Sequence, residues 1–243
     1  MKQQLDKNIL NSLLLAHEQW YQTKQRQGKQ LLCENVDLQG ADLSNRQLVK
    51  AEFKHVDLRN ANLSNTDLAL AAFMDVDVRG ASLTRAGMAG ITVEDTDLSG
   101  ADLQDANLSA SFMRAVRMEG ALLTNATLIK CLWHDVILSQ INLSNVDATS
   151  AEFVHCIMNK SQWHNAVLVN TKFLHCNLPQ ASFTGAVLKG TSFRGSSVFG
   201  CAGPVASLSN ILGDWVDISP AADGSQVVPV SVLEMMLHRS SEK

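Results

Sequence analysis

The sequence has 243 residues, of which 46% are hydrophobic, so the chain is long and apolar enough to bury a sizeable core. Its formal net charge of −4 argues against a nucleic-acid-binding protein, which normally carries a basic patch. No apolar run approaches the ~18 residues that a membrane span needs, and the start lacks a secretory hydrophobic segment, so we expect a cytoplasmic protein that does not contact a membrane.

Residues 1–30 are expected to form an N-terminal helical cap. Apolar and aromatic residues recur at helical spacing between residues 3 and 24, and a turn rich in Gln and Lys follows at Gly28. The residues of this stripe are Leu5, Ile9, Leu10, Leu13, Leu14, His17, Trp20 and Tyr21. We expect this helix to cover the start of the segment that follows.

Residues 31–200 are dominated by a period of five. From Val36 to Gly200 the sequence divides into 33 pentapeptides without an insertion. The centre of each unit is a large apolar residue except at Ala148, and the position two residues earlier is small or β-branched except at Arg46. Neither a helix nor a strand puts every fifth residue on one face, so the chain must turn a corner at each unit and stack its coils around an apolar column.

A second period of twenty residues predicts four pentapeptides per coil. Every fourth centre from Phe53 onward is aromatic in most coils, whereas the other three columns of centres are mainly Leu. The 33 units then make about eight coils. We expect the structural core to include Leu38, Leu43, Phe53, Phe73, Leu103, Trp133, Phe153, Trp163, Phe173 and Phe193.

The units at 41–45 (ADLSN), 61–65 (ANLSN) and 101–105 (ADLQD) resemble the A(D/N)LXX repeats of the pentapeptide-repeat family. This resemblance implies an all-β solenoid, a right-handed quadrilateral β-helix with four repeats per coil. His17, Trp20 and Gly28 are also similar to a lead-in helix that many members carry. The expected fold is therefore a four-sided β-helix of about eight coils with helical terminal segments.

Residues 201–243 are expected to be a C-terminal loop and a short helix. The period stops after Cys201, Gly203-Pro204 interrupts the chain, and residues 214–226 are typical of a loop around Trp215. An amphipathic helix is predicted at Val230–Arg239. Because both ends of a solenoid expose unpaired strand edges, this helix either caps the last coil or forms a dimer contact.

The residues that could carry chemistry do not form a catalytic or metal-binding motif. His155 and His175 are twenty residues apart and would stack on one wall with His134 nearby, but no second pair of ligands accompanies them. A ladder of carboxylates would lie on a flat wall that offers no pocket for a substrate: Asp37, Asp57, Asp77 and Asp97. The five cysteines include no CxxC pair. We therefore expect no catalytic, cofactor-binding or metal-binding residues, no cofactor, and a protein that is not an enzyme.

Apolar residues at outward positions on two adjacent walls predict a partner surface, because exposed apolar area usually marks one. The candidate interaction surface comprises these residues and the aspartate ladder: Leu70, Met74, Phe112, Leu132, Val169, Leu174, Asp37, Asp57, Asp77 and Asp97. The leading hypothesis is a non-enzymatic scaffold that presents a rigid side wall to a protein partner of unknown identity and that forms a homodimer.

The family resemblance also implies an alternative function. One branch of the family mimics B-DNA in size and charge, binds DNA gyrase or topoisomerase, and protects it from quinolones or peptide toxins. Here residues 36–105 carry 12 acids and 6 bases, whereas residues 106–200 carry 4 acids and 7 bases. Duplex DNA carries one negative charge per about 1.7 Å throughout, so the charge of the second half speaks against mimicry. We expect no direct binding of nucleic acid.

Overall fold

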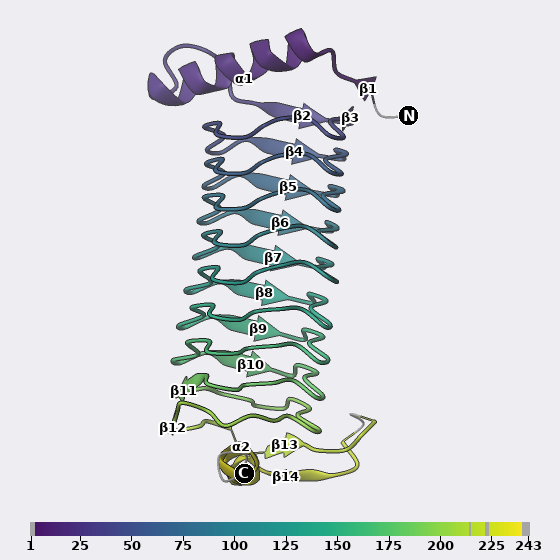
Figure 1. Cartoon of the computed structure of the whole chain (residues 1–243). Helices are drawn as coiled ribbons and strands as arrows, with labels where there is room; N and C mark the ends of the chain where they lie inside the picture. The colour runs from purple at the N-terminus through teal and green to yellow at the C-terminus, as the bar shows by residue number, and fades with distance from the viewer. Residues whose placement is uncertain (1–2, 214, 222–223, 240–243) are drawn as a thin grey trace.

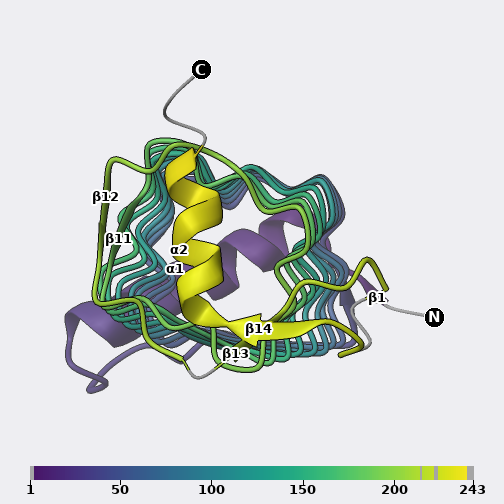
Figure 2. The ribbon, with the colours of Figure 1, turned by 90° about the horizontal axis from the view of Figure 1, so that it is seen from below.

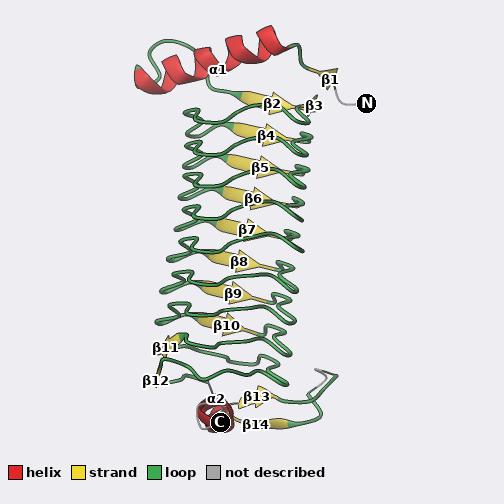
Figure 3. Cartoon of the chain, viewed as in Figure 1, coloured by secondary structure: helices red, strands yellow, loops and turns green. Residues whose placement is uncertain are grey.

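The chain folds into a rod of stacked four-sided coils with a helix at each end (Figures 1 and 3). The computed structural model describes residues 3–213, 215–221 and 224–239. Each coil takes twenty residues, because strand partners along the rod, such as Phe53 and Phe73, are twenty residues apart. The expected right-handed quadrilateral β-helix is confirmed.

One wall, which we call the first wall, is a parallel sheet of eight short strands. The central residue of each strand points inward and its two neighbours point outward, which follows from the two-residue alternation of a strand. The strands are β2 (Leu32–Glu34), β4 (Glu52–Lys54), β5 (Ala72–Met74), β6 (Thr92–Glu94), β7 (Phe112–Arg114), β8 (Leu132–His134), β9 (Glu152–Val154) and β10 (Lys172–Leu174). The second, third and fourth walls follow in chain order around each coil and are joined by single parallel bridges.

The corners between walls are made by residues in the left-handed backbone conformation. The φ angle is 55° at Asn65 and 58° at Leu70, for example. At most positions where the residue before the buried centre is Asp or Asn, its side chain stabilises the turn. The backbone N–H of Ser64 donates to Asn62 Oδ1 at 3.1 Å in this way. The preference of the repeat for Asp or Asn at this position has this local cause.

The interior of the rod is a continuous apolar column. The ten residues expected in the core are all buried. Phe53 and Phe73 meet edge to face with ring centroids 5.1 Å apart, whereas Phe173 stacks on Phe153 at 5.3 Å and on Phe193 at 5.1 Å. These five rings therefore line one interior column behind the first wall, as the twenty-residue period predicts.

The first coil is covered by α1 (Lys7–Gln22). Asp6 caps this helix, since its side chain accepts hydrogen bonds from the backbone N–H groups of Asn8 and Ile9. The helix buries Leu10, Leu14 and His17. A short strand before it, β1 (Gln3–Gln4), pairs in parallel with β3 (Val36–Asp37). The N-terminal segment thus protects the edge of the first coil.

The solenoid continues past residue 200, where the sequence predicts a loop. On the fourth wall, β11 (Val187–Lys189) pairs in parallel with β12 (Ser207–Ser209). Parallel bridges then join Ser192 to Leu212 and Ser197 to Asp217. The rod therefore has about nine coils, one more than the 33 pentapeptides alone account for.

The last coil ends in a hairpin and a helix. Within the segment expected to be a loop around Trp215, β13 (Trp215–Asp217) pairs antiparallel with β14 (Val227–Pro229). The helix α2 (Val230–Arg239) lies across the open end of the rod (Figure 2). It buries Leu233 and Leu237 in the core. Of the two roles left open by the sequence for this helix, the cap is the one that uses its apolar stripe.

Candidate interaction surface

The apolar residues of the candidate surface lie on two walls that meet at a corner. Met74, Phe112, Leu132 and Leu174 are half-buried on the outer face of the first wall. Val169, on the fourth wall, is also half-buried, and Leu70, at the corner, is 56% exposed. These outward positions follow from the strand alternation around each buried centre.

The structure brings some of these residues together and separates others. Phe112 pairs with Leu132 across β7 and β8. Leu174 pairs with Val154 across β9 and β10, but in the other outward column of the wall, since Val154 is in register with His134 and Leu132 with Glu152. Met74 is set apart because its partner in the following strand is Glu94, which forms an ion pair of 3.0 Å with Arg114. The apolar area of the first wall is therefore concentrated on β7–β10.

The aspartate ladder lies on the second wall, where parallel bridges link Asp37, Asp57, Asp77 and Asp97. Arginines two residues after two of these aspartates alternate with the carboxylates. Arg59 Nη2 lies 2.6 Å from Asp57 Oδ2, and Arg59 Nε lies 3.6 Å from Asp77 Oδ2. Arg79 Nη2 in turn lies 2.6 Å from Asp77 Oδ2, and Arg79 Nε lies 3.9 Å from Asp97.

This pairing reduces the exposure and the net charge of the aspartate ladder. Asp57 is only 8% exposed and contacts Arg59 through both carboxylate oxygens. The hydrogen bond from the Arg79 side chain lowers the pKa of Asp77 below its usual value. Two arginines thus offset the charge of two of the four aspartates, so the ladder presents less negative charge than its aspartates suggest.

The third wall carries a second polar ladder that the sequence analysis missed. At its corner, Asn125 Nδ2 donates to Asp105 Oδ1 at 3.0 Å. The series of hydrogen bonds continues into the next coils: Asn145 Nδ2 donates to Asn125 Oδ1 at 3.1 Å, and Asn165 Nδ2 donates to Asn145 Oδ1 at 3.3 Å. The signal was present in the sequence as Asp or Asn recurring every twenty residues.

The histidines and cysteines do not assemble into a site of their own. The rings of His155 and His175 stack with centroids 5.4 Å apart. Among the residues that the structure describes, no three His, Cys, Asp or Glu side chains are placed to hold a metal ion. All five cysteines are buried, and burial raises the pKa of Cys33 to about 11 and that of Cys201 to about 12. These two thiols therefore stay protonated at neutral pH, and a protonated thiol is a poor nucleophile.

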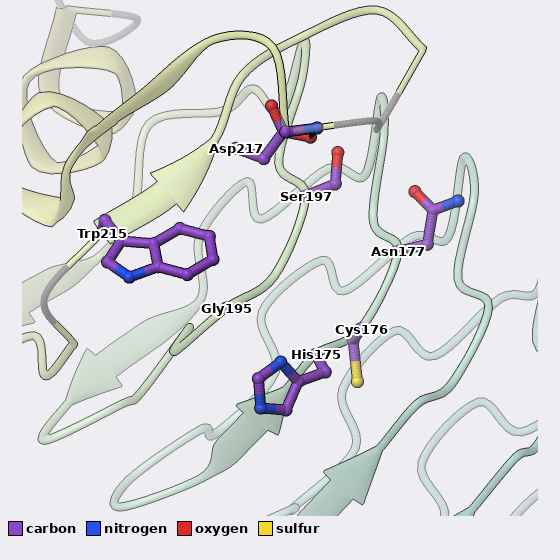
Figure 4. A pocket seen from close by; sticks show the side chains of 8 residues that line it. His175, Cys176, Asn177, Gly195, Ser197, Trp215 and Asp217 are labelled. Atoms are coloured by element: carbon purple, nitrogen blue, oxygen red, sulfur yellow. Dashed lines mark hydrogen bonds between the residues drawn. The ribbon is translucent and has the colours of Figure 1, made fainter.

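A cavity of about 240 Å³ opens at the lower end of the corner between the first and second walls. It is lined by residues of three successive coils and by Gly224 (Figure 4). Its lining residues are His175, Cys176, Asn177, Gly195, Ser197, Trp215, Asp217 and Gly224. Sequence analysis did not find this cavity, because it assigned the residues around Trp215 to a loop.

Over the described part of the chain, no helix has the length and apolar character to cross a membrane.

Comparisons with known proteins agree with this architecture. A family model for pentapeptide repeats matches in 8 copies, over residues 37–73, 51–88, 101–132 and 164–198. A pentapeptide repeat protein from the thylakoid lumen of Arabidopsis thaliana is 33% identical over 37% of this chain and 63% of its own, with a TM-score of 0.37. This chain therefore spans less than two thirds of that protein.

Two further solved structures cover more of the chain at lower identity. HetL, a pentapeptide repeat protein involved in heterocyst differentiation regulation in the cyanobacterium Nostoc sp. strain PCC 7120, is 19% identical over 91% of this chain and 99% of its own, with a TM-score of 0.35. A trypsin-treated form of QnrB1, a plasmid-mediated fluoroquinolone resistance protein, is 17% identical over 76% of this chain and 90% of its own, with a TM-score of 0.33. No curated protein matches the sequence.

Proposed function

Because the chain belongs to the pentapeptide-repeat family, we propose that it is a non-enzymatic scaffold that binds a protein partner through an apolar area of its first wall. We call this area the first-wall patch and define it as Phe112, Leu132, Val154 and Leu174. The observation that carries the proposal is that these side chains face outward from four consecutive strands, β7–β10. They form two in-register pairs in the two outward columns of the wall, Phe112 with Leu132 and Val154 with Leu174. Apolar side chains exposed together on the outside of a protein usually mark a partner surface.

The backbone beneath the patch is rigid, which favours binding. The N–H of Leu132 donates to the carbonyl of Ser111 at 2.9 Å, and equivalent ladder bonds hold the strands before and after it. A surface that is already ordered loses little conformational entropy when a partner docks. The patch also has charged neighbours, such as the 3.0 Å pair between Lys172 and Glu152, which resemble the polar rim of an interface.

The chemistry of the walls supports a binding role over an enzymatic one. A general acid or base needs a pKa near the working pH, whereas the pKa of Asp77 is lowered by its hydrogen bond with Arg79. Its neighbour in the ladder, Asp57, is held by Arg59. These carboxylates remain ionised and paired at neutral pH, so they stabilise the wall and do not move protons.

A second copy of the chain is one partner that the patch would fit, and we propose a homodimer formed through the first wall. The apolar stripe of α2 is not available for this purpose, since Leu233 and Leu237 are buried inside the chain. Light scattering on the full chain should then give twice the monomer mass. A monomer at high concentration would contradict the homodimer but leave a foreign partner in place.

The alternative, mimicry of DNA towards gyrase or topoisomerase, has less support. A mimic needs regularly spaced uncompensated negative charge. In the second wall Arg59 and Arg79 offset two of the four aspartates of the ladder, and the pKa of both guanidinium groups is raised by the carboxylates that they contact. This arrangement reduces the negative charge on which mimicry depends.

The test is affinity capture from the source cells, with mass spectrometry of the retained proteins. One variant combines Leu132→Lys and Leu174→Lys, which places charge in the first-wall patch. Its matched control combines Leu122→Lys and Ile157→Lys, since these residues are 42% and 40% exposed on other walls. We expect a specific partner to be retained by the wild type and the control but lost by the patch variant. Equal retention by all three would refute the proposal, and retention of gyrase by all three would favour the alternative.

A further inference from the structure

The cavity at the lower corner exists because one residue in a column of corner side chains has no side chain. Residues at this corner repeat every twenty positions, and the last four are His155, His175, Gly195 and Trp215. The φ angle of Gly195 is 67°, and a Cβ added there would lie 2.4 Å from His175 Nδ1. The imidazole of His175 therefore leans over Gly195, into space that any other residue would fill.

The two aromatic rings bound the cavity from different coils. His175 belongs to the coil above Gly195, and the bridge between Ser197 and Asp217 places Trp215 in the coil below. Figure 4 shows Gly195 between the indole of Trp215 and the imidazole of His175. Both rings are accessible, and Trp215 is 43% exposed. The cavity is therefore lined by one aromatic ring from the coil above Gly195 and one from the coil below it.

On the second wall the cavity is lined by oxygen atoms, two of which lack a hydrogen-bond donor within the described part of the chain. Asn177, Ser197 and Asp217 occupy equivalent positions in three successive coils, joined by parallel bridges. Among the residues that the structure describes, neither Ser197 Oγ nor Asn177 Oδ1 has a hydrogen-bond partner, although both atoms are buried. Ser197 is only 6% exposed and lines the cavity. Buried polar atoms are normally satisfied, so these two mark a position where a ligand donates.

The next oxygen along this row is negatively charged. The Asp217 carboxylate is 5% exposed and is oriented by the backbone N–H of Ser219 at 2.8 Å and that of Gly224 at 2.9 Å. In sequence, residues 201–243 carry five acids and two bases, so this segment as a whole is acidic. Arg194, the residue before Gly195, is exposed to solvent, which screens its charge.

We propose that this cavity binds the guanidinium group of an arginine side chain presented by a protein partner. A guanidinium is planar, stacks on aromatic rings, carries five N–H donors and accepts no hydrogen bonds, so it fits a site made of two rings and several acceptor oxygens. It would stack between His175 and Trp215, donate to Ser197 Oγ and Asn177 Oδ1, and lie close to the Asp217 carboxylate. This inference rests on the proposed scaffold function, to which it adds an anchor residue of the partner.

The direct test uses N-acetyl-L-arginine amide as the probe and the full chain as the receptor. Indole N–H resonances are followed by NMR, and the Trp215 resonance is assigned from the Trp215→Phe variant. We expect a saturable shift of that resonance alone. Two control compounds separate charge from shape: N-acetyl-L-citrulline amide has the same planar shape but no charge, and N-acetyl-L-lysine amide has the charge but no planar group. Both should bind at least about five-fold more weakly than the arginine probe, as expected when a charged hydrogen bond is lost.

Two variants separate binding from folding. Ser197→Ala should lower the affinity for the arginine probe by about five-fold, the loss expected for one hydrogen bond. It should not lower the melting temperature, because the Ser197 hydroxyl has no hydrogen-bond partner in the free protein. Gly195→Asn introduces a residue type that the protein already has at other corners, such as Asn165, but its side chain fills the cavity. This variant should abolish the shift of the Trp215 resonance. Gly100→Asn is the matched control, since a Cβ there has nothing within 4 Å, and it should bind as the wild type does.

Two results would contradict an arginine site in this cavity. A folded wild type whose Trp215 resonance does not respond to the arginine probe, or responds equally to citrulline, overturns the inference. Stronger binding of adenosine or cytidine would assign the cavity to a nucleobase instead. These titrations involve no residue of the first-wall patch. Loss of arginine binding here, with partner capture still dependent on Leu132 and Leu174, would remove this inference and leave the proposed function standing.

Discussion

Replacing Leu103 with alanine tests whether the rod is held together by its central column. Leu103 is fully buried at the centre of the third wall. Its backbone N–H donates to the carbonyl of Leu122 in the next coil at 2.8 Å, and Leu83 donates to Asp102 from the coil before. Since both neighbouring coils are fixed by such bonds, the walls cannot close over the lost carbon atoms.

The expected destabilisation follows from this rigidity. Buried Leu→Ala substitutions cost about 2–5 kcal/mol, and the cost rises with the volume of the cavity that remains. A site that cannot collapse belongs in the upper part of that range, so we expect Leu103→Ala to lower the free energy of unfolding by about 3–5 kcal/mol. The matched control is Leu122→Ala on the same wall, because Leu122 is 42% exposed. It should change stability by less than about 0.5 kcal/mol.

The assay is unfolding in guanidinium chloride, followed by circular dichroism and by tryptophan fluorescence. Solenoids can lose cooperativity, so the two signals must coincide before a free energy is taken from either. Leu103→Met, which nearly conserves volume, should cost less than about 1.5 kcal/mol. If Leu103→Ala and Leu122→Ala shifted the midpoint equally, the central column would not be the source of stability.

Three further outcomes follow from named contacts. Ser111→Ala leaves the buried Trp133 Nε1–H without its 3.0 Å acceptor and should cost about 1–3 kcal/mol in urea unfolding; an unchanged midpoint would contradict this. Deleting 228–243 uncovers the last coil and should cause aggregation in light scattering, so a clean monomer would show that α2 is not a cap. Arg79 lowers the pKa of Asp77 in the folded state, so this contribution to stability is complete above the unfolded pKa of about 3.9 and is lost as pH falls through the lower folded value. Asp77→Asn should therefore flatten the acid side of a plot of melting temperature against pH, and an unaltered slope would contradict the assignment.

The sequence predicted the solenoid because its cause is local and repeated. Each unit carries its own inward centre, small inward partner and turn residue, so thirty-three weak signals agree. The last coil was missed because its centres change type: Gly203 and Gly213 stand where large apolar residues stood before. The backbone ladder nevertheless continues, since Leu212 N donates to Thr191 O at 2.8 Å. In the last coil, backbone hydrogen bonds to the coil above hold the chain in place although the large apolar centres are missing.

The surface was less predictable, for two different reasons. Burial of Asp57 could have been anticipated from Asp57-Leu58-Arg59, because residues on either side of an inward centre project from the same wall and can pair. The cavity beside Trp215, in contrast, could not have been predicted from the sequence. It depends on the antiparallel pairing of β13 with β14, and a contact between segments that lack the period is not written in any local pattern.

This contrast explains why specific recognition is expected at the end of such a rod. In the column of corner residues that ends at Trp215, one side chain packs on the next, as in the stack of His155 on His175, so the wall above the cavity is flat and offers broad contact but no enclosure. Gly195 interrupts this stack. It removes one side chain from the column, and Trp215 and Asp217 close the gap from the last coil, where β13 also pairs with β14. The walls can therefore supply area, while the chemistry that selects one particular side chain of a partner is concentrated where the period of five ends.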